Sequence, residues 1–242
     1  MPTSHYRKPS SKAVILEISA AMGGADAAVF AGELLRAYLR YAETKSWQSE
    51  LLESSPAGRG VRSASLRIAG NGVEALRSEA GTHRVQRQPA NDRTGRRHTS
   101  AVTVAVLPVP DLAEQSLDLA CVKIETFRSS GPGGQNMQKT DSAVRAIHQP
   151  TGISAVISDE RSQHRNRQRA LELLATRLNA QQQAAQNFER SRLRRSMKGT
   201  GHIAERIRTY AYRDNIVTDH RSGFKTSLQP VLSGDLSALV GS

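Results

Sequence analysis

A long helical pattern in the second half of the chain constrains the fold more than any other feature. From 165 to about 198 the residues keep helical periodicity without interruption. Three apolar residues share one face: Leu171, Leu174 and Leu178. Gly199 and Gly201 follow, and glycines end helices because they accept left-handed backbone conformations. The sequence therefore predicts one long helix, rich in arginine, with a narrow apolar face.

Shorter patterns before and after this helix predict strands. The runs at 13–20, 47–54, 61–68, 83–88 and 99–108 are short, and several alternate between apolar and polar residues. A helix with one apolar face is predicted from Ala25 to about Thr44. Further strands are predicted at 122–127, 143–148, 153–158 and 227–231, with short extended pieces at 207–212 and 216–217. We expect an α+β fold with two lobes.

Pro108 and Pro110, followed by a cluster of acidic residues, indicate a domain boundary. We expect a basic, flexible arm at 1–12 and a mixed α/β domain formed by 13–114 with 225–242. The smaller α+β domain, 115–224, would carry the long basic helix.

The net charge of +12, most of it in residues 121–242, indicates a polyanionic partner. Aromatic residues make up only 4% of the chain, which argues against binding single strands by base stacking and favours contact with folded RNA. The single cysteine excludes an internal disulfide and a cysteine-based zinc site. No segment has the length of a membrane span, and residues 1–12 lack the apolar core of a signal peptide, so we expect a cytoplasmic protein.

A glycine-rich stretch from Arg128 to Asn136 carries the candidate chemistry. Gly133 and Gly134 permit backbone conformations closed to other residues, so their N–H groups can lie against a reacting centre. Gln135 offers an amide donor and acceptor but no acid, base or nucleophile. Any chemistry here must therefore position a water molecule and stabilise developing charge. A lone Gly-Gly-Gln tripeptide is more often a surface turn, so the flanking residues decide the interpretation.

Those flanking residues continue in a long, specific pattern. It comprises Arg128–Gln135, Lys139–Arg145, Gly152–Ile153 and Asp159–His164. The pattern resembles the catalytic domain of the class I peptide chain release factors of bacteria, which hydrolyse the ester between nascent peptide and tRNA at a stop codon. The resemblance implies that Gly133, Gly134 and Gln135 enter the peptidyl transferase centre of the ribosome and that Gln135 is N5-methylated by a dedicated methyltransferase. It implies no metal or small-molecule cofactor, and we expect a monomer that is nearly inert on esters without the ribosome.

The first domain is also similar to release factors, specifically to the branch that reads UAG and UAA. Three segments carry this similarity: Phe30–Arg36, His83–Arg87 and His98–Val106. In that family a Pro-X-Thr tripeptide, the tip of one helix and a His-Thr pair read the codon. The equivalent positions here, together with Gln86, are Gly23, Asp26, Pro89, Ala90, Asn91, His98 and Thr99.

The chain departs from the family pattern in ways that bear on decoding. Asn91 stands where the family has threonine, and Asp26 where it has glutamate, one methylene longer. Hydrogen-bonding sites discriminate strongly against altered groups, so the resemblance does not by itself fix which codon is read. The family's N-terminal helical domain and final C-terminal helix are also expected to be missing.

Basic residues around the glycine stretch and on the long helix are expected to contact ribosomal RNA. They are Arg128, Lys139, Arg145, Arg165, Arg167, Arg169, Arg194 and Arg195. Arg208 and Arg221, in segments similar to the family's, either tie the domains together or touch RNA.

Three functional hypotheses remain open at the level of sequence. The chain terminates translation at UAG and UAA, or it rescues stalled ribosomes with altered codon reading, which the departures favour. The alternative is a non-catalytic RNA-binding protein that occupies the ribosomal A site, and the intact Gly-Gly-Gln argues against it. No Ser-His-Asp pattern at recognisable spacing supports a free esterase.

Overall fold

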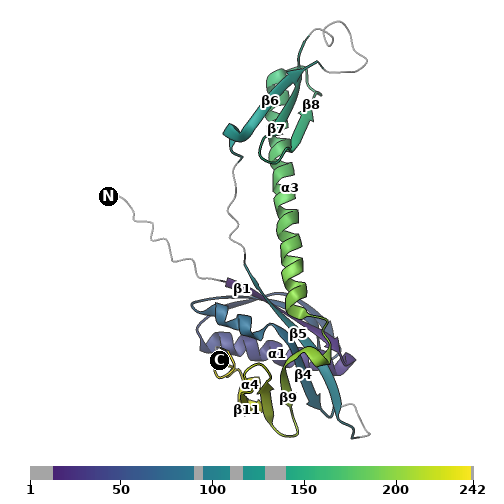
Figure 1. Ribbon diagram of the computed structural model, residues 1–242, viewed down its shortest axis with the longest axis vertical. Coiled ribbons are helices and arrows are strands. Elements are labelled where there is room, and N and C mark those ends of the chain that lie inside the picture. The colour runs from purple at the N-terminus through teal and green to yellow at the C-terminus, as the bar shows by residue number, and fades with distance from the viewer. Residues whose placement is uncertain (1–12, 90–94, 110–116, 129–139, 241–242) are drawn as a thin grey trace, which may run out of the picture. The chain divides into compact units, whose positions relative to one another are not determined.

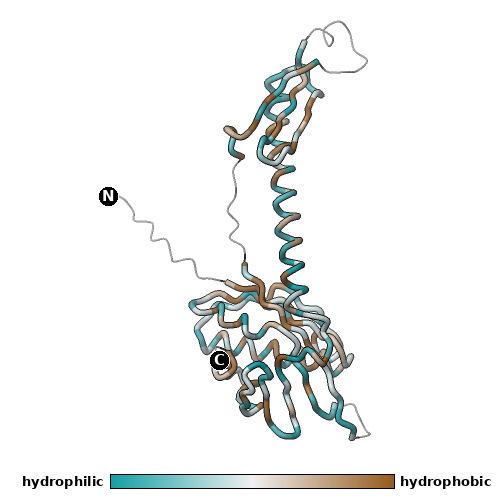
Figure 2. Tube along the Cα trace, in the orientation of Figure 1, coloured by the Kyte–Doolittle hydropathy of each residue, from teal (hydrophilic) through white to brown (hydrophobic). Residues whose placement is uncertain are grey.

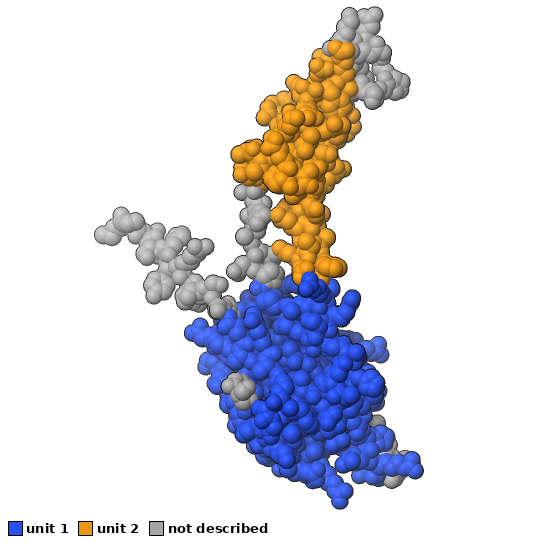
Figure 3. All heavy atoms as spheres, in the orientation of Figure 1, with its two compact units in different colours: residues 1–110, 190–242 blue, residues 111–189 orange. Residues whose placement is uncertain are grey.

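The computed structural model describes residues 13–89, 95–109, 117–128 and 140–240 (Figure 1). The chain divides into two compact units (Figure 3). Unit 1 comprises 1–110 and 190–242, and unit 2 comprises 111–189. The mixed α+β class is confirmed, because each unit combines a sheet with helix.

Unit 1 is built on an eight-stranded sheet with the order β11-β10-β9-β4-β5-β1-β3-β2. The strands are β1 (Ala13–Met22), β2 (Gln48–Ala57), β3 (Gly60–Ala69), β4 (Gly81–Arg87), β5 (His98–Pro108), β9 (Arg206–Ala211), β10 (Ile216–Asp219) and β11 (Lys225–Ser227). Neighbouring strands are antiparallel except β4 and β9, which are parallel. The apolar–polar alternation predicted for β1 matches its burial. Val14, Leu16 and Ile18 are buried, and the residues between them are half-buried.

Helix α1 (Gly24–Thr44) covers one face of this sheet. Its apolar stripe, including Phe30, Leu34 and Tyr38, joins the core formed by β1, β3 and β5. Gly23 precedes the helix with φ 111°, in the left-handed region. A Cβ atom there would lie 2.2 Å from Ser100 Oγ, so the start of the helix approaches β5 closely.

Short helical segments complete unit 1. These are the 3-10 helices Val73–Glu79 and Ile203–Glu205, and helix α4 (Leu228–Leu232). The strand predicted at 227–231 is wrong beyond Ser227, which ends β11, because the residues that follow form α4. Leu228 and Val231, three positions apart, are both 1% exposed, which is helical spacing. Pro230 is tolerated because it lies in the first turn, where the N–H group has no partner within the helix.

Unit 2 holds a three-stranded antiparallel sheet with the order β6-β7-β8. The strands are β6 (Val122–Phe127), β7 (Ala143–His148) and β8 (Ser154–Ile157), preceded by a 3-10 helix at Leu119–Cys121. Helix α3 (Gln163–Lys198) packs on this sheet through Leu174 and Leu178, which are buried, and Leu171, which is half-buried. The predicted apolar face is thus confirmed, and Gly199, with φ 55°, follows the helix as expected.

The compact units divide the chain differently from the predicted domains. Residues 190–224, predicted with the second domain, group with unit 1 because β9 pairs with β4 and β10 pairs with β9. The division falls inside α3, whose residues 179–189 are all exposed. Figure 2 shows α3 as mostly hydrophilic over its length. The predicted arm at 1–12 lies outside the described residues.

Candidate functional site

The glycine-rich segment is held between two paired strands of unit 2. Gly133, Gly134, Gln135 and Lys139 lie outside the described residues, but the chain on both sides of them is described. Phe127, the last residue of β6, pairs directly with Ala143, the first of β7. The segment therefore leaves and re-enters the sheet at one residue pair.

Asn166, in the first turns of α3, holds the described chain that follows this segment. Its side chain is fully buried and donates to Ser142 O at 2.7 Å and to Glu160 O at 2.8 Å. Its Oδ1 accepts from Glu160 N at 3.1 Å. One amide thus satisfies three backbone groups, as its mixed donor and acceptor capacity allows. Sequence reasoning missed Asn166, whose only signal is a polar residue on the apolar side of the helix.

The arginines of unit 2 expected to bind RNA are exposed. Arg128 lies 3.5 Å from Asp141, and Arg145 lies 3.9 Å from Glu125 with its guanidinium over the ring of Phe127. Arg165 and Arg169 both approach Glu160, at 3.7 and 3.1 Å. Arg167 is exposed. Exposed ion pairs of this kind are weak, so these guanidinium groups can exchange a carboxylate for a phosphate.

Arg194 is placed differently, because it anchors the end of α3 to β1 within unit 1. Its guanidinium donates to both oxygens of Glu17, at 2.7 and 2.6 Å, and Lys198 lies 3.5 Å from the same carboxylate. Burial raises the pKa of Glu17, but the bonds and charges of Arg194 and Lys198 outweigh it and hold the pKa below its usual range. The neighbouring Arg195 is exposed.

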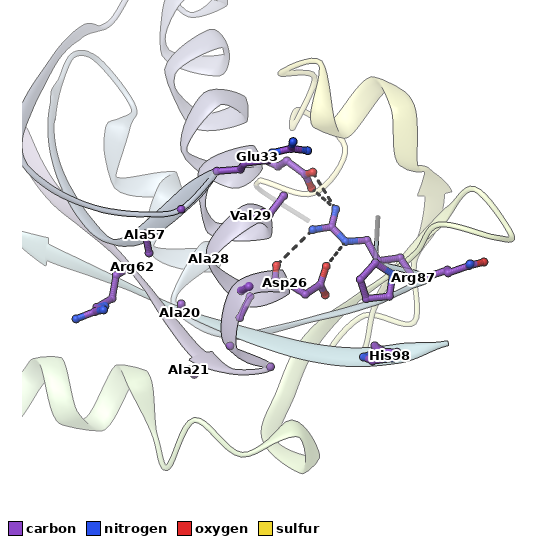
Figure 4. A pocket seen from close by; sticks show the side chains of 18 of the residues that line it. Ala20, Ala21, Asp26, Ala28, Val29, Glu33, Ala57, Arg62, Arg87 and His98 are labelled. Carbon is purple, nitrogen blue, oxygen red and sulfur yellow. Dashed lines mark hydrogen bonds and ion pairs between the residues drawn. The ribbon is translucent and has the colours of Figure 1, made fainter. Parts of the chain in front are cut away.

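A pocket of about 1490 Å³ opens beside the start of α1 in unit 1 (Figure 4). Arg87 lines it, and the Arg87 guanidinium lies between two carboxylates (Figure 4). Arg87 donates to Asp26 Oδ1 at 2.7 Å and to Glu33 Oε1 and Oε2 at 2.8 and 2.9 Å. It also lies over the ring of Tyr212, whose hydroxyl donates to Glu33. Burial lowers the pKa of Arg87, but the bonds to Glu33 and Asp26 outweigh it and raise the pKa above its usual value.

The structure brings together some of the predicted codon-reading residues and separates others. Four of them line this pocket: Gly23, Asp26, Pro89 and His98. Gln86 and Thr99 pair directly across β4 and β5, one position from the pair formed by Arg87 and His98. Because neighbouring side chains alternate between faces, Gln86 and Thr99 lie on the opposite face of the sheet from His98. Ala90 and Asn91 lie outside the described residues.

The Asp26 side chain, 9% exposed, has both carboxylate oxygens engaged. Oδ1 accepts from Arg87 and Oδ2 accepts from Ser100 Oγ at 2.7 Å. The tip of α1 is therefore tied to β4 and β5. Sequence reasoning missed Arg87, Glu33 and Tyr212. Only the spacing of Asp26 and Glu33, seven positions apart on one helix face, could have indicated a shared cation.

A buried polar network in unit 1 surrounds Arg208. Its guanidinium, fully buried, pairs with Glu79 and with Asp219, at 2.9 Å from the latter, and donates to Leu239 O at 2.8 Å. Burial raises the pKa of Asp219, but Arg221 and Arg208 together lower it far below its usual value. Of the two roles left open for Arg208, the structure shows a tie within unit 1, between the C-terminal segment and the sheet. Arg221, whose side chain is 43% exposed, supports Asp219 from outside at 2.9 Å.

Neither a candidate membrane-spanning helix nor a cluster of metal ligands occurs among the described residues. None of the helices described there combines the length and apolar character that a membrane span requires. Within the same ranges, no group of three or more His, Cys, Asp or Glu side chains is arranged to hold a metal ion.

Comparisons with known proteins match both parts of the chain. Residues 5–104 match the PCRF domain, and residues 112–221 match the RF-1 domain. Peptide chain release factor 1 of Burkholderia multivorans is 47% identical over 232 residues, and that of Solidesulfovibrio magneticus is 46% identical over 233. These matches cover 94% and 95% of this chain but only 64% and 65% of the relatives' own length.

A solved structure supports the same relationship. RF2 of Thermus thermophilus is 38% identical and superposes with a TM-score of 0.56, covering 95% of this chain and 66% of that one. The RF-1 match encloses the Gly133–Gln135 tripeptide, and the PCRF match encloses the residues that line the α1 pocket up to His98. Over these two domains the chain belongs to the family of class I peptide chain release factors.

Proposed function

We propose that this chain hydrolyses the peptidyl-tRNA ester on the ribosome, with Gly133, Gly134 and Gln135 as the catalytic tripeptide. The observation that carries the proposal is the match of residues 112–221 to the RF-1 domain, which contains the tripeptide intact. The partners are ribosomal RNA, the P-site peptidyl-tRNA and the codon in the A site.

The proposed chemistry uses backbone and amide groups only. The backbone N–H of Gln135 stabilises the charge that develops on the departing 3′ oxygen of the tRNA. The Gln135 side chain lies beside the attacking water and excludes larger nucleophiles. Gly133 and Gly134 permit the backbone geometry. RNA supplies the rest of the site, and Gln135 is the residue expected to be N5-methylated.

The described part of unit 2 supports this proposal because it fixes the chain on both sides of the tripeptide. The paired ends of β6 and β7, together with buried Asn166, give the segment a rigid base. Rigid support of a catalytic group lowers the entropy cost of placing it at the reacting centre. Arg128 directly follows β6, and Arg165 and Arg169 lie on either side of Asn166 in α3, so exposed positive charge for RNA is available beside this base.

Codon reading is proposed to be altered, as in rescue of stalled ribosomes. Each oxygen of the Asp26 carboxylate already accepts a hydrogen bond within unit 1, and the side chain is only 9% exposed, so it is less available to a base edge than a free carboxylate. The residue acts instead as an anchor for the tip of α1. Asn91, in place of the family's threonine, changes a second reading position.

Release assays on programmed ribosomes test both parts. We expect Gly134→Ala to reduce peptide release by at least a hundredfold while ribosome binding is kept, because the loss affects only transition-state stabilisation. Release by that variant at the wild-type rate would contradict the catalytic assignment. In a panel of UAG, UAA, UGA, sense and empty A sites, selective release at UAG and UAA alone would contradict altered reading and leave hydrolysis intact.

A further inference from the structure

Several arginines lie on the face of the unit 1 sheet that is opposite α1. Their hydrogen-bond partners are neutral groups, whereas the arginines on the α1 side pair with carboxylates. We call this opposite face the outer face. Val85 and Tyr210 point to the α1 side, where Tyr210 packs against Phe30 with ring centroids 5.0 Å apart. Their neighbours Arg84 and Thr209 therefore lie on the outer face, where the two residues are in register. Arg84 Nε donates to Thr209 Oγ1 at 3.1 Å.

A β-bulge brings a second arginine to the outer face. Thr82 pairs with Arg206 and the next residue, His83, pairs with Arg208, so the register shifts by one residue in β9. Without this shift Arg206 would share the buried side of Arg208, two positions away. The bulge turns Arg206 toward the side of Thr82 and Arg84, as bulges commonly redirect side chains near functional sites.

Neutral polar groups link the two arginines. Arg206 Nε donates to His220 Nε2 at 3.3 Å, and the Thr209 hydroxyl bonds to the same nitrogen at 2.7 Å. His220 Nε2 is therefore an acceptor, so the ring is neutral. Burial, followed by the charges of Arg206 and Arg84, lowers the pKa of His220. Arg97 directly precedes β5 and lies two positions before Thr99, whose side chain is on the outer face, so alternation places Arg97 on the same side as Arg84. Burial, followed by the charges of Arg206 and Arg97, lowers the pKa of Arg84.

These three arginines have no counter-charge among the described residues. Arg87 and Arg208, on the α1 side, pair with carboxylates. In the same described ranges, no ion pair joins Arg84, Arg97 or Arg206 to a carboxylate. Like charges held together without a partner destabilise a protein unless an anion binds between them. Guanidinium forks match the oxygens of a phosphate.

The neighbourhood of the cluster identifies the class of anion. Gln86 and Thr99 lie on the same face, two positions along β4 and β5 from Arg84, which corresponds to about 7 Å. Neutral amide and hydroxyl groups beside guanidinium groups are typical of nucleic-acid contacts, in which base edges and phosphates are bound side by side. We infer that Arg84, Arg97 and Arg206 bind a phosphodiester of an RNA strand on the outer face. The inference deepens the proposed function and rests on it for RNA as the ligand.

The double variant R84A/R206A tests the inference against a matched control. R36A/R40A removes the same charge from exposed positions on α1. With a fluorescent single-stranded 12-nucleotide RNA, we expect R84A/R206A to bind roughly tenfold more weakly and to show a slope of log K against log salt shallower by about 1.4. The control should keep a slope close to that of the wild type. R84K/R206K should restore the slope, because it restores both charges.

Three results would overturn the inference: equal binding by R84A/R206A and the wild type, an equal effect of the control pair, or a slope that the lysine pair does not restore. Release assays separate this outcome from failure of the proposed function. There R84A/R206A should need more protein for half-maximal release at an unchanged maximal rate. A wild type that releases no peptide overturns the proposed function, whereas the RNA titration alone decides the phosphodiester site.

Discussion

His83 is a fully buried histidine with both ring nitrogens bonded inside unit 1. Nε2 lies 2.9 Å from Glu79 O, which only accepts, so Nε2 carries the proton. Nδ1 then accepts from the Tyr210 hydroxyl at 3.0 Å. Burial lowers the pKa of His83 to about 4, with Arg208 and Arg221 adding to the effect and Glu79 opposing it. The folded state therefore binds the neutral ring and resists its protonation.

This arrangement predicts a loss of stability in mild acid. Between pH 6.5 and pH 4 the unfolded chain binds a proton at His83 that the folded chain does not, so the free energy of unfolding falls as the pH falls. The full loss is about 3 kcal/mol, of which about 2 kcal/mol falls between pH 7.5 and 5, where denaturant unfolding measures it. His83→Gln should flatten this dependence even if it lowers stability at every pH. His220→Gln is the control, because it removes another histidine whose pKa is lowered but which lies outside the bonds of His83. An unchanged slope in His83→Gln would contradict the assignment.

Elements were predictable from the sequence to the extent that local periodicity determines them. The alternation in 13–20 and the leucine spacing in α3 depend on the immediate neighbours, and both agree with the structure. The strand prediction at 227–231 failed because a run of five residues with one proline is as compatible with a strand as with one helical turn. The Arg87–Asp26 pair joins residues 61 positions apart, and the β9 bulge depends on pairing with β4. Neither leaves a periodic signal, so the ion pair and the redirected Arg206 could not be predicted from the sequence.

The proposed chemistry depends on the rigid base of the glycine-rich segment, which consists of the paired ends of β6 and β7 and the buried Asn166. Asn166→Ala leaves three backbone groups of Ser142 and Glu160 without their partner, at a cost of about 1–3 kcal/mol. We expect a lower unfolding temperature and a release rate reduced at least tenfold, because the tripeptide loses its fixed support. Asn166→Asp keeps the acceptor for Glu160 N but turns a carboxylate oxygen toward two carbonyl oxygens in a buried site, so it should be at least as destabilising as Asn166→Ala. A normal release rate in Asn166→Ala would show that the base does not position the tripeptide.

The molecule as a whole has two separate cores of unequal size. The core of unit 1 unites β1, α1, β3 and β5 with the C-terminal residues up to Val240. The core of unit 2 is small, and three alanines, Ala146, Ala155 and Ala170, are among its six buried members. Between them, residues 179–189 of α3 are exposed and contribute no buried contacts. Because small cores stabilise weakly, unit 2 should unfold before unit 1.

Calorimetry should therefore show two transitions, with unit 2 unfolding at the lower temperature. Leu174→Ala, at a fully buried position of α3, removes about 2–5 kcal/mol from unit 2 and should lower only the first transition. Leu34→Ala, equally buried in unit 1, should lower only the second. Binding of the 12-nucleotide RNA to the outer face should raise the second transition alone, because ligands stabilise the unit that holds them. A single transition that both variants shift equally would mean that α3 couples the two cores despite its exposed middle, and the units would then fold as one.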